Sequence, residues 1–193
     1  MLRFRLLSLR VGISIYFLGL IALLPFFDRT GSMFFALGAC FLHEAGHLLF
    51  LLLCYRRPAD LRIGLFGMRL TVDELHLSDW QELSFVLAGP LSNFAAGLVL
   101  HLAQADVRWF LFNFAVGLFN LLPVMPLDGG NALRVLLGLI LRDSGRAYRA
   151  ADVIGIVTVV MLVTVLVYLF VSSTFNITLL IAILYITALM MKN

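Results

Sequence analysis

Long apolar runs separated by short polar stretches dominate this sequence. A helix that crosses a bilayer needs about 20 consecutive, mostly apolar residues. By that measure the pattern predicts six membrane-spanning helices, at about 11–27, 32–55, 83–103, from 107 onward, 153–171 and 176–191. Arg3, Arg5 and Arg10 precede the first run and give the N-terminus the character of a signal peptide, but no small-x-small cleavage site clearly follows. We therefore expect the first helix to be retained.

The fourth apolar run is interrupted by two prolines, Pro123 and Pro126. Proline lacks the backbone N–H that a helix interior needs, and the glycines at 129 and 130 permit a sharp turn. An apolar helix then continues over about 133–140. Broken backbone at membrane depth is tolerated only where protein buries it or where it lines a watery cavity. The pattern thus predicts a broken fourth helix.

The most polar stretch, 56–82, lies between the second and third expected spans. Within it, apolar residues partly alternate over 61–72 and two glycines punctuate them, which favours a short β-hairpin near the membrane surface. The expected fold class is an all-α polytopic membrane protein with this one membrane-associated hairpin. We expect a single domain over 1–193, with core helices within about 32–142.

Composition supports a membrane protein and excludes an ordinary soluble domain. The chain is 62% hydrophobic and only 13% charged, with a mean hydropathy of +1.04, whereas soluble domains carry about 25% charged residues. The net charge of +3 does not indicate nucleic acid, because the basic residues lie between apolar runs and there set membrane orientation. With a cytoplasmic N-terminus, every basic residue except Arg29 and Arg108 falls on the cytoplasmic side. We therefore expect both termini to be cytoplasmic.

The second expected span contains a motif that carries chemistry, His-Glu-x-x-His at His43, Glu44 and His47. On a helix, positions i and i+4 share a face, so both imidazoles can reach one metal ion. Glu44 lies beside the ion, where it can accept a proton from a bound water. Ionisable residues inside a spanning helix are costly and usually functional. The alternative is a polar cluster that is only hydrogen-bonded between helices.

A catalytic zinc usually has three protein ligands, so a third is needed. His76, in the polar loop, and His101, near the outer end of the third span, are more typical of surface or interfacial histidines. Asp128 is the better candidate, because it lies at the helix break in a stretch with almost no other charge. The alternative is that Asp128 caps a helix that starts near Asn131.

Two amides are candidate substrate-binding groups. Asn120 precedes the helix break and could hold a substrate backbone or a developing oxyanion. Asn93, in the third span, could present a second amide to the substrate. The alternative for both is hydrogen bonding between helices, with the small residues around Asn93 allowing close packing.

Together these motifs resemble the site-2 protease family of intramembrane metalloproteases, peptidase family M50. The resemblance rests on His43-Glu44-x-x-His47, on Asn120-x-x-Pro123 with Leu127-Asp128-Gly129, and on Gly89-Pro90-x-x-Asn93. It implies that His43, His47 and Asp128 bind Zn²⁺ and that Glu44 is the general base. It also implies that Asn120 positions the substrate and that the strands near 61–72 present it unwound.

The resemblance further implies an intramembrane metalloendopeptidase that cuts membrane proteins in regulated proteolysis, in a bacterial inner membrane. The six-span layout is most similar to the branch that processes sporulation pro-sigma factors. We expect no PDZ or CBS domain, and the substrate, any regulatory partner and the oligomeric state stay open. Two alternatives also stay open: a non-catalytic relative that binds transmembrane segments, and a transporter with a broken helix.

Overall fold

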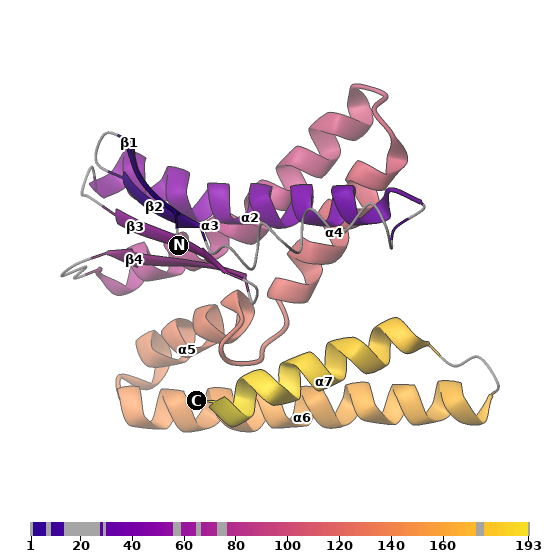
Figure 1. Ribbon diagram of the computed structural model, residues 1–193. Helices are drawn as coiled ribbons and strands as arrows, with labels where there is room; N and C mark the ends of the chain where they lie inside the picture. The colour runs from indigo at the N-terminus through magenta and orange to yellow at the C-terminus, as the bar shows by residue number, and fades with distance from the viewer. Residues whose placement is uncertain are drawn as a thin grey trace. The chain divides into compact units, whose positions relative to one another are not determined.

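The computed structural model describes residues 2–6, 9–13, 28, 30–55, 59–64, 67–72, 77–172 and 176–192 (Figure 1). The chain divides into two compact units. Unit 1 comprises residues 1–77 and 88–117, and unit 2 comprises residues 78–87 and 118–193. Helices make up most of the described chain, as the apolar runs predict.

Unit 1 contains a four-stranded sheet in the order β1-β2-β3-β4, drawn side by side in Figure 1. Its strands are β1 (Leu2–Leu6), β2 (Leu9–Ile13), β3 (Ala59–Gly64) and β4 (Gly67–Val72). Strands β3 and β4 pair antiparallel, with Leu61 opposite Leu70, so the strand pair expected near 61–72 is present. It is part of a larger sheet, because β2 pairs parallel with β3 and antiparallel with β1.

The sheet corrects the expected first span at its start. Residues 11–13 belong to β2 rather than to a membrane helix. The strict alternation of apolar and basic residues over 2–6 suits a strand, and it continues into a hairpin with 9–13. The rest of that expected span, 14–27, lies outside the described residues.

Helix α2 (Ser32–Tyr55) begins and ends where the apolar run predicts, and belongs to unit 1. Helix α3 (Asp79–Leu102) begins four residues before the expected 83. Asp79 and Glu82 lie in its first turn, where carboxylates are favourable with the helix dipole. Helix α4 (Val107–Asn120) follows after a short polar turn. The last 15 residues of α3 and most of α4 complete unit 1.

Unit 2 is built on the break after α4. Helix α5 (Asp128–Leu141), α6 (Ser144–Val171) and α7 (Ile177–Lys192) follow it, so the expected fourth helix is indeed broken. Val124 and Leu127 of the break are buried with Ile186 of α7 in the core of this unit. Helix α6 starts at Ser144 rather than at the expected 153, because the Asp143 carboxylate caps it by accepting from the Arg146 N–H at 3.0 Å.

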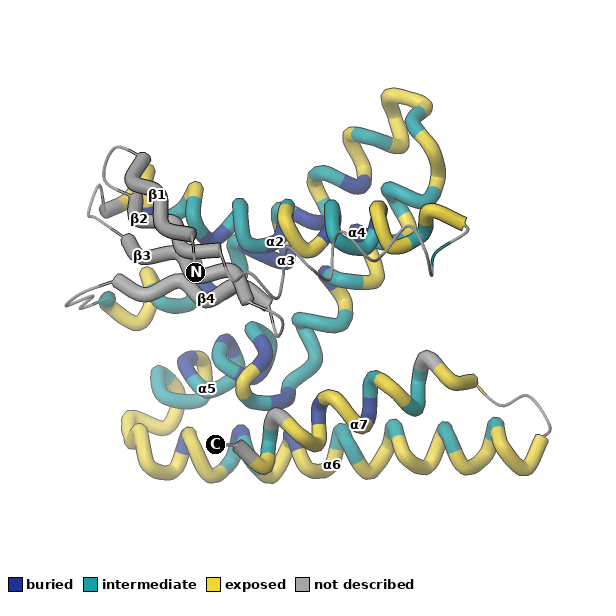
Figure 2. Tube along the Cα trace, viewed as in Figure 1, coloured by how far each residue is buried: buried dark blue, intermediate teal, exposed yellow. Residues whose placement is uncertain are grey.

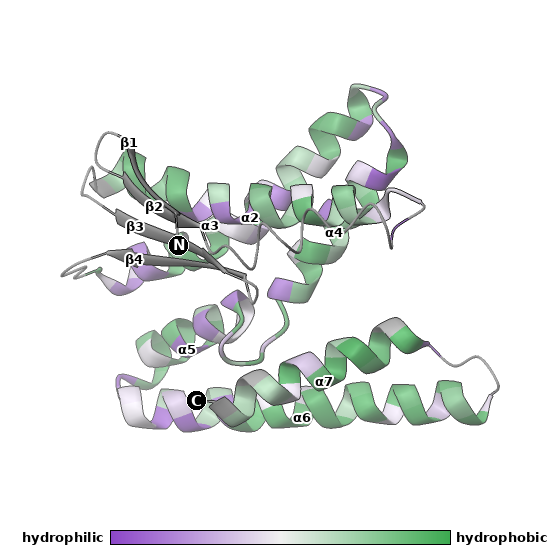
Figure 3. Cartoon of the chain, in the orientation of Figure 1, coloured by the Kyte–Doolittle hydropathy of each residue, from purple (hydrophilic) through white to green (hydrophobic). Residues whose placement is uncertain are grey.

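Three helices of the described chain are long and apolar enough to cross a membrane, at Ser32–Cys54, Asp79–Leu102 and Ser144–Val171. Figure 3 shows the apolar character of α6 and α7, and Figure 2 shows how much of α6 is exposed. Only 6% of the apolar window of α6 is buried within the protein, which suits a helix surrounded by lipid. The chain is therefore a membrane protein, and the count of six spans stays a prediction.

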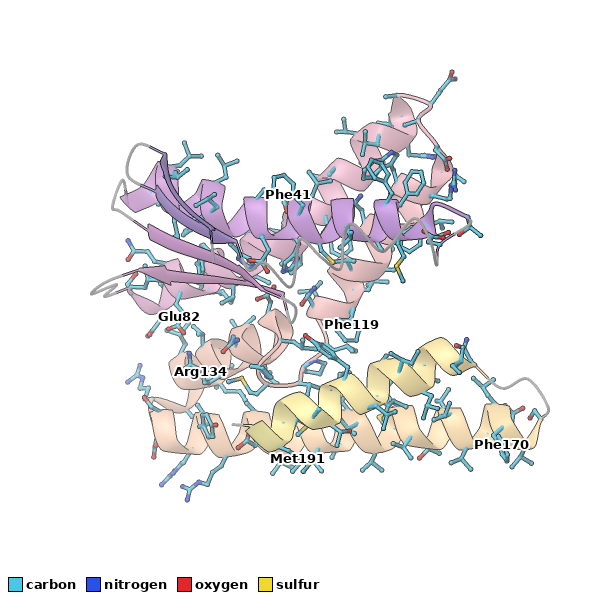
Figure 4. All side chains as sticks on the ribbon, viewed as in Figure 1. Phe41, Glu82, Phe119, Arg134, Phe170 and Met191 are labelled. Atoms are coloured by element: carbon cyan, nitrogen blue, oxygen red, sulfur yellow. The ribbon has the colours of Figure 1, made fainter. Side chains whose placement is uncertain are left out.

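One ion pair connects the two sequence segments of unit 2, 78–87 and 118–193. Arg134 of α5 donates a hydrogen bond to the carboxylate of Glu82 in the first turn of α3. Figure 4 shows the two labelled side chains close together. Both are about one-third exposed, with 34% and 31% of their side-chain areas accessible. The pair therefore links α5 to the start of α3 at a partly solvated position.

Candidate metal centre

His43 and His47 lie one turn apart on the same face of α2, as the motif predicts. Both side chains are buried, each with 6% of its surface exposed. Their Nε2 atoms are 3.3 Å apart and their rings are nearly perpendicular, at 82°. The spacing of four positions produces this approach, because residues i and i+4 share a helix face. Glu44 follows His43 directly and is half-buried.

The distance between the two imidazoles fits one tetrahedral zinc ion. Zn–N bonds of about 2.0–2.1 Å, at the tetrahedral angle, hold two ligand nitrogens about 3.3–3.4 Å apart. The two Nε2 atoms lie 3.3 Å apart, within that range. Neutral imidazole is also among the commonest zinc donors in proteins. The pair thus has both the donor type and the spacing that zinc requires.

Glycines allow α3 to approach the histidines closely. A Cβ added at Gly89 would lie 2.7 Å from Cε1 and 2.8 Å from Nε2 of His43, and closer still to Nε2 of His47. A Cβ added at Gly46 would lie 2.6 Å from the Ala88 carbonyl oxygen. Neither position has room for a larger residue without a shift of α2, α3 or the imidazoles. Gly89 in particular packs directly against both imidazoles and forms one wall of the space around the histidine pair.

A chain of buried amides continues from His43 into α3 and α4. His43 Nδ1 lies 2.8 Å from Asn93 Oδ1, and Asn93 Nδ2 donates to the Ala39 carbonyl at 2.8 Å and to Asn113 Oδ1 at 2.9 Å. Asn113 Nδ2 donates in turn to the Trp109 carbonyl at 2.8 Å. Both asparagines are completely buried. Both N–H groups of Asn93 thus donate within unit 1, as the alternative of hydrogen bonding between helices predicts, and a role of Asn93 in substrate binding stays a prediction.

Asp128 is the first residue of α5, in unit 2, and is half-buried. The helix therefore begins three residues before the expected Asn131. Leu127 occupies the cap position, so Asp128 lies in the first turn rather than at the cap. A carboxylate is favourable there with the helix dipole. Asn120 is the last residue of α4, also half-buried and also in unit 2.

The glycine pair after Asp128 explains how α5 folds back against the break. A Cβ at Gly129 would collide with the carbonyl group of Leu121 and lie 2.6 Å from the Leu122 oxygen. A Cβ at Gly130 would lie 2.5 Å from the Val124 carbonyl carbon. The first turn of α5 is thus held in direct backbone contact with the break. The position of Asp128 within unit 2 depends on these two glycines.

Two further histidines were considered as ligands from the sequence. His101 is exposed near the end of α3, with its ring centroid 5.2 Å from that of Phe110, as expected of an interfacial histidine. His76 lies outside the described residues. Asn113 was not identified from the sequence as part of the site, and Gly89 was identified only as part of the Gly89-Pro90-x-x-Asn93 motif. For Asn113 the available signal was an amide in the middle of the mostly apolar α4, which also contains Asn120 and Arg108.

Charged groups gather at the polar ends of α2 and α4, outside the spanning segments. The Arg108 side chain and backbone donate to the Asp106 carboxylate and lower its pKa to about 2. Arg108 Nη1 also donates to the Thr30 carbonyl at 2.8 Å. The Met33 N–H and the Thr30 hydroxyl donate to Asp28 and lower its pKa. Both carboxylates therefore stay ionised at neutral pH and accept hydrogen bonds from backbone N–H groups in the first turns of α2 and α4.

Comparison with known proteins supports the resemblance that the motifs indicate. Residues 106–167 match the family model described as peptidase family M50. A protein of Synechocystis sp. that is named as a zinc metalloprotease is 30% identical over 128 residues. That alignment covers 58% of this chain but 33% of the relative, so this chain spans about a third of the relative's length.

A solved structure supports the fold. The site-2 protease from Methanocaldococcus jannaschii superposes with a TM-score of 0.63, covering 96% of this chain and 91% of its own. At 24% identity, this likeness establishes the fold. The chain is thus similar in sequence to peptidase family M50 over residues 106–167 and similar in fold to a site-2 protease, as the motifs indicate.

Proposed function

We propose that this chain, which resembles the site-2 proteases of peptidase family M50, is a zinc-dependent intramembrane endopeptidase. It hydrolyses a peptide bond in or near a transmembrane segment of a membrane protein. The observation that carries this proposal is the pair of buried imidazoles, His43 and His47, with Nε2 atoms 3.3 Å apart. The pair lies within a helix long and apolar enough to cross a membrane.

In this proposal His43, His47 and Asp128 hold the zinc ion. Two imidazoles and one carboxylate form a common ligand set of catalytic zinc, which leaves a fourth position open for water or substrate. The chemistry that zinc supplies at such a site is polarisation of a carbonyl, together with a water that ionises near neutral pH. Asp128 is suited to its role because it begins α5 directly after the break in the backbone.

Glu44 is the general base in this reaction. It accepts the proton of the attacking water and returns it to the leaving amine, which splits the peptide bond without net proton change at Glu44. Asn120, at the end of α4, donates its amide to the substrate backbone or to the developing oxyanion. The strands β3 and β4 lie next to the membrane surface and present an unwound substrate segment.

The cellular setting of the proposal follows from charge and resemblance. The chain is placed in a bacterial inner membrane with both termini cytoplasmic, since all basic residues but Arg29 and Arg108 then lie inside. Its partners are the lipid bilayer and a membrane-protein substrate, and its role is regulated intramembrane proteolysis. The assignment to the branch that processes sporulation pro-sigma factors stays a prediction.

The experiment that tests the function compares the membrane proteomes of cells that carry wild type and Glu44→Gln. Glutamine keeps the size of the side chain but cannot accept the proton, so an uncut membrane protein should accumulate only in the variant. Glu82→Gln provides a matched control with the same chemical change at the start of α3, where the ion pair with Arg134 lies.

A non-catalytic relative that binds transmembrane segments is the competing function. It predicts that Glu44→Gln leaves every membrane protein at its wild-type size and abundance. That result, with both proteins expressed equally, would contradict the proposed proteolysis.

A further inference from the structure

We infer that Asn113 of α4 is a positioning residue that acts through Asn93 to hold His43 in one tautomer, with Nε2 available to a metal. The inference rests on the proposed function, since it concerns how a zinc ligand is prepared. The contacts that carry it lie entirely within unit 1.

The direction of the amide chain is fixed by backbone carbonyls at two points. A carbonyl oxygen can only accept, so the group of Asn113 that faces the Trp109 carbonyl at 2.8 Å must be its NH₂. Asn113 therefore turns its Oδ1 towards Asn93. By the same reasoning the NH₂ of Asn93 faces the Ala39 carbonyl at 2.8 Å. The Asn113 oxygen then receives the second N–H of that group, at 2.9 Å.

This direction determines which ring nitrogen of His43 carries the proton. The remaining oxygen of Asn93 lies 2.8 Å from His43 Nδ1 and can only accept, so Nδ1 carries the hydrogen. In neutral imidazole one nitrogen is protonated and the other has a lone pair, so the lone pair is on Nε2. Nε2 is the atom that lies 3.3 Å from Nε2 of His47. The amide chain thus selects the tautomer that a zinc ligand needs.

Burial makes this selection strong. Asn93 and Asn113 are both fully buried, so water does not compete for their hydrogen bonds. A broken bond would leave a buried polar group unsatisfied, which is costly in a low-dielectric interior. The three residues come from α2, α3 and α4, so the chain also fixes the orientation of the His43 ring against two other helices. Partners of this kind typically change metal affinity about 10–100-fold.

The experiment uses the full chain in detergent, as wild type, Asn93→Leu, Asn113→Leu and the double variant. Zinc affinity is measured by competition with a chelator. The His43 tautomer is measured in the zinc-free protein by the chemical shifts of its ¹⁵N-labelled ring nitrogens. Thr164→Val is the matched control, because it removes an exposed side-chain hydrogen bond within α6.

The expected result is a loss of zinc affinity of about 10–100-fold for Asn93→Leu and a smaller loss for Asn113→Leu, because Ala39 still anchors Asn93. In both variants His43 should show a mixture of tautomers. In the Asn93→Leu background, Asn113→Leu should have no further effect, since it acts through Asn93. Thr164→Val should match wild type.

The inference is overturned if Asn113→Leu keeps the wild-type tautomer and zinc affinity. It is equally overturned if Asn113→Leu lowers the zinc affinity by the same factor in the wild-type and in the Asn93→Leu background. Should Asn113→Leu fail to fold, Asn113→Ala replaces it, with the same criteria. A wild-type protein that shows the single His43 tautomer but binds no zinc would instead contradict the proposed function and leave the inference standing.

Discussion

The wall that Gly89 forms beside the histidines gives a sharp prediction for Gly89→Ala. The added methyl would lie 2.8 Å from His43 Nε2, whereas ordinary contact begins at 3.4 Å, so that atom must move by about 0.6 Å (3.4 − 2.8). Metal–ligand distances in zinc sites lie within about 0.2 Å of their usual values. A misplacement near 1 Å costs about 100-fold in catalysis. We therefore expect kcat/KM to fall about 100-fold and zinc affinity to fall at least about tenfold.

The assay for Gly89→Ala measures zinc affinity by chelator competition, cleavage of a membrane-protein substrate, and thermal unfolding in detergent. Gly138→Ala is the matched control, because a Cβ at Gly138 in α5 meets nothing within 4 Å. That control should keep full zinc affinity and unfold at the same or a slightly higher temperature, since alanine favours a helix over glycine by about 0.5–1 kcal/mol. Wild-type zinc affinity and cleavage in Gly89→Ala would refute the reasoning.

Three further predictions concern the break, the ion pair and the charged helix ends. Gly129→Ala should lower cleavage and the unfolding temperature together, because its methyl collides with the Leu121 carbonyl; an unchanged protein in both assays would count against the tight turn. Arg134→Ala should lower the free energy of unfolding by about 0.2–1 kcal/mol. In a protein that already carries Glu82→Ala, the same substitution should have no further effect, which a double-mutant cycle would measure. The pKa of Asp106 is lowered from 3.8 to about 2, so its charge stabilises the fold above about pH 4, and that stability is lost as the pH falls towards 2. The free energy of unfolding should therefore fall less steeply with decreasing pH between pH 4 and 2 in Asp106→Asn than in wild type. An identical slope in the two proteins would contradict the Arg108 contact.

The sequence predicted the parts of the fold that depend on local signals. Helix α2 was placed at its observed ends because an uninterrupted apolar run defines it. The break at 121–127 was predicted because Pro123 and Pro126 each remove a backbone N–H donor and so disfavour a helix interior. The early start of α6 was missed, because Arg146 and Arg149 made its first turns polar. Its capping residue, Asp143, was the signal that could have placed it.

The sheet was predicted only in part. Strands β3 and β4 are joined by a short connection, so their pairing was visible in the alternation around 61–72. Strand β1 also alternates, but Arg3 and Arg5 were interpreted as orientation signals of a membrane helix. The parallel pairing of β2 with β3 joins segments far apart in sequence, and no local pattern indicates it.

At the site, the His43–His47 pair followed from helix periodicity alone. Asn93 was recognised as a candidate, but its role depends on its neighbours in α2 and α4, which the sequence of α3 does not reveal. Asn113 was missed for the same reason, since an amide in a mostly apolar helix does not reveal its neighbour. Gly89 was identified as part of a motif, but its contact with the histidines was not predicted. The third ligand, Asp128, remains a proposal drawn from its chemistry and its place after the break.

The most direct test of the account is X-ray absorption at the zinc edge of the purified wild-type protein, with its zinc content measured on the same sample. The account predicts one zinc ion per chain, bound by two imidazole nitrogens and by oxygen, with the Asp128→Ala variant losing most of its zinc. A protein without zinc, a zinc bound by the sulfur of Cys40 or Cys54, or full zinc occupancy in Asp128→Ala would contradict it.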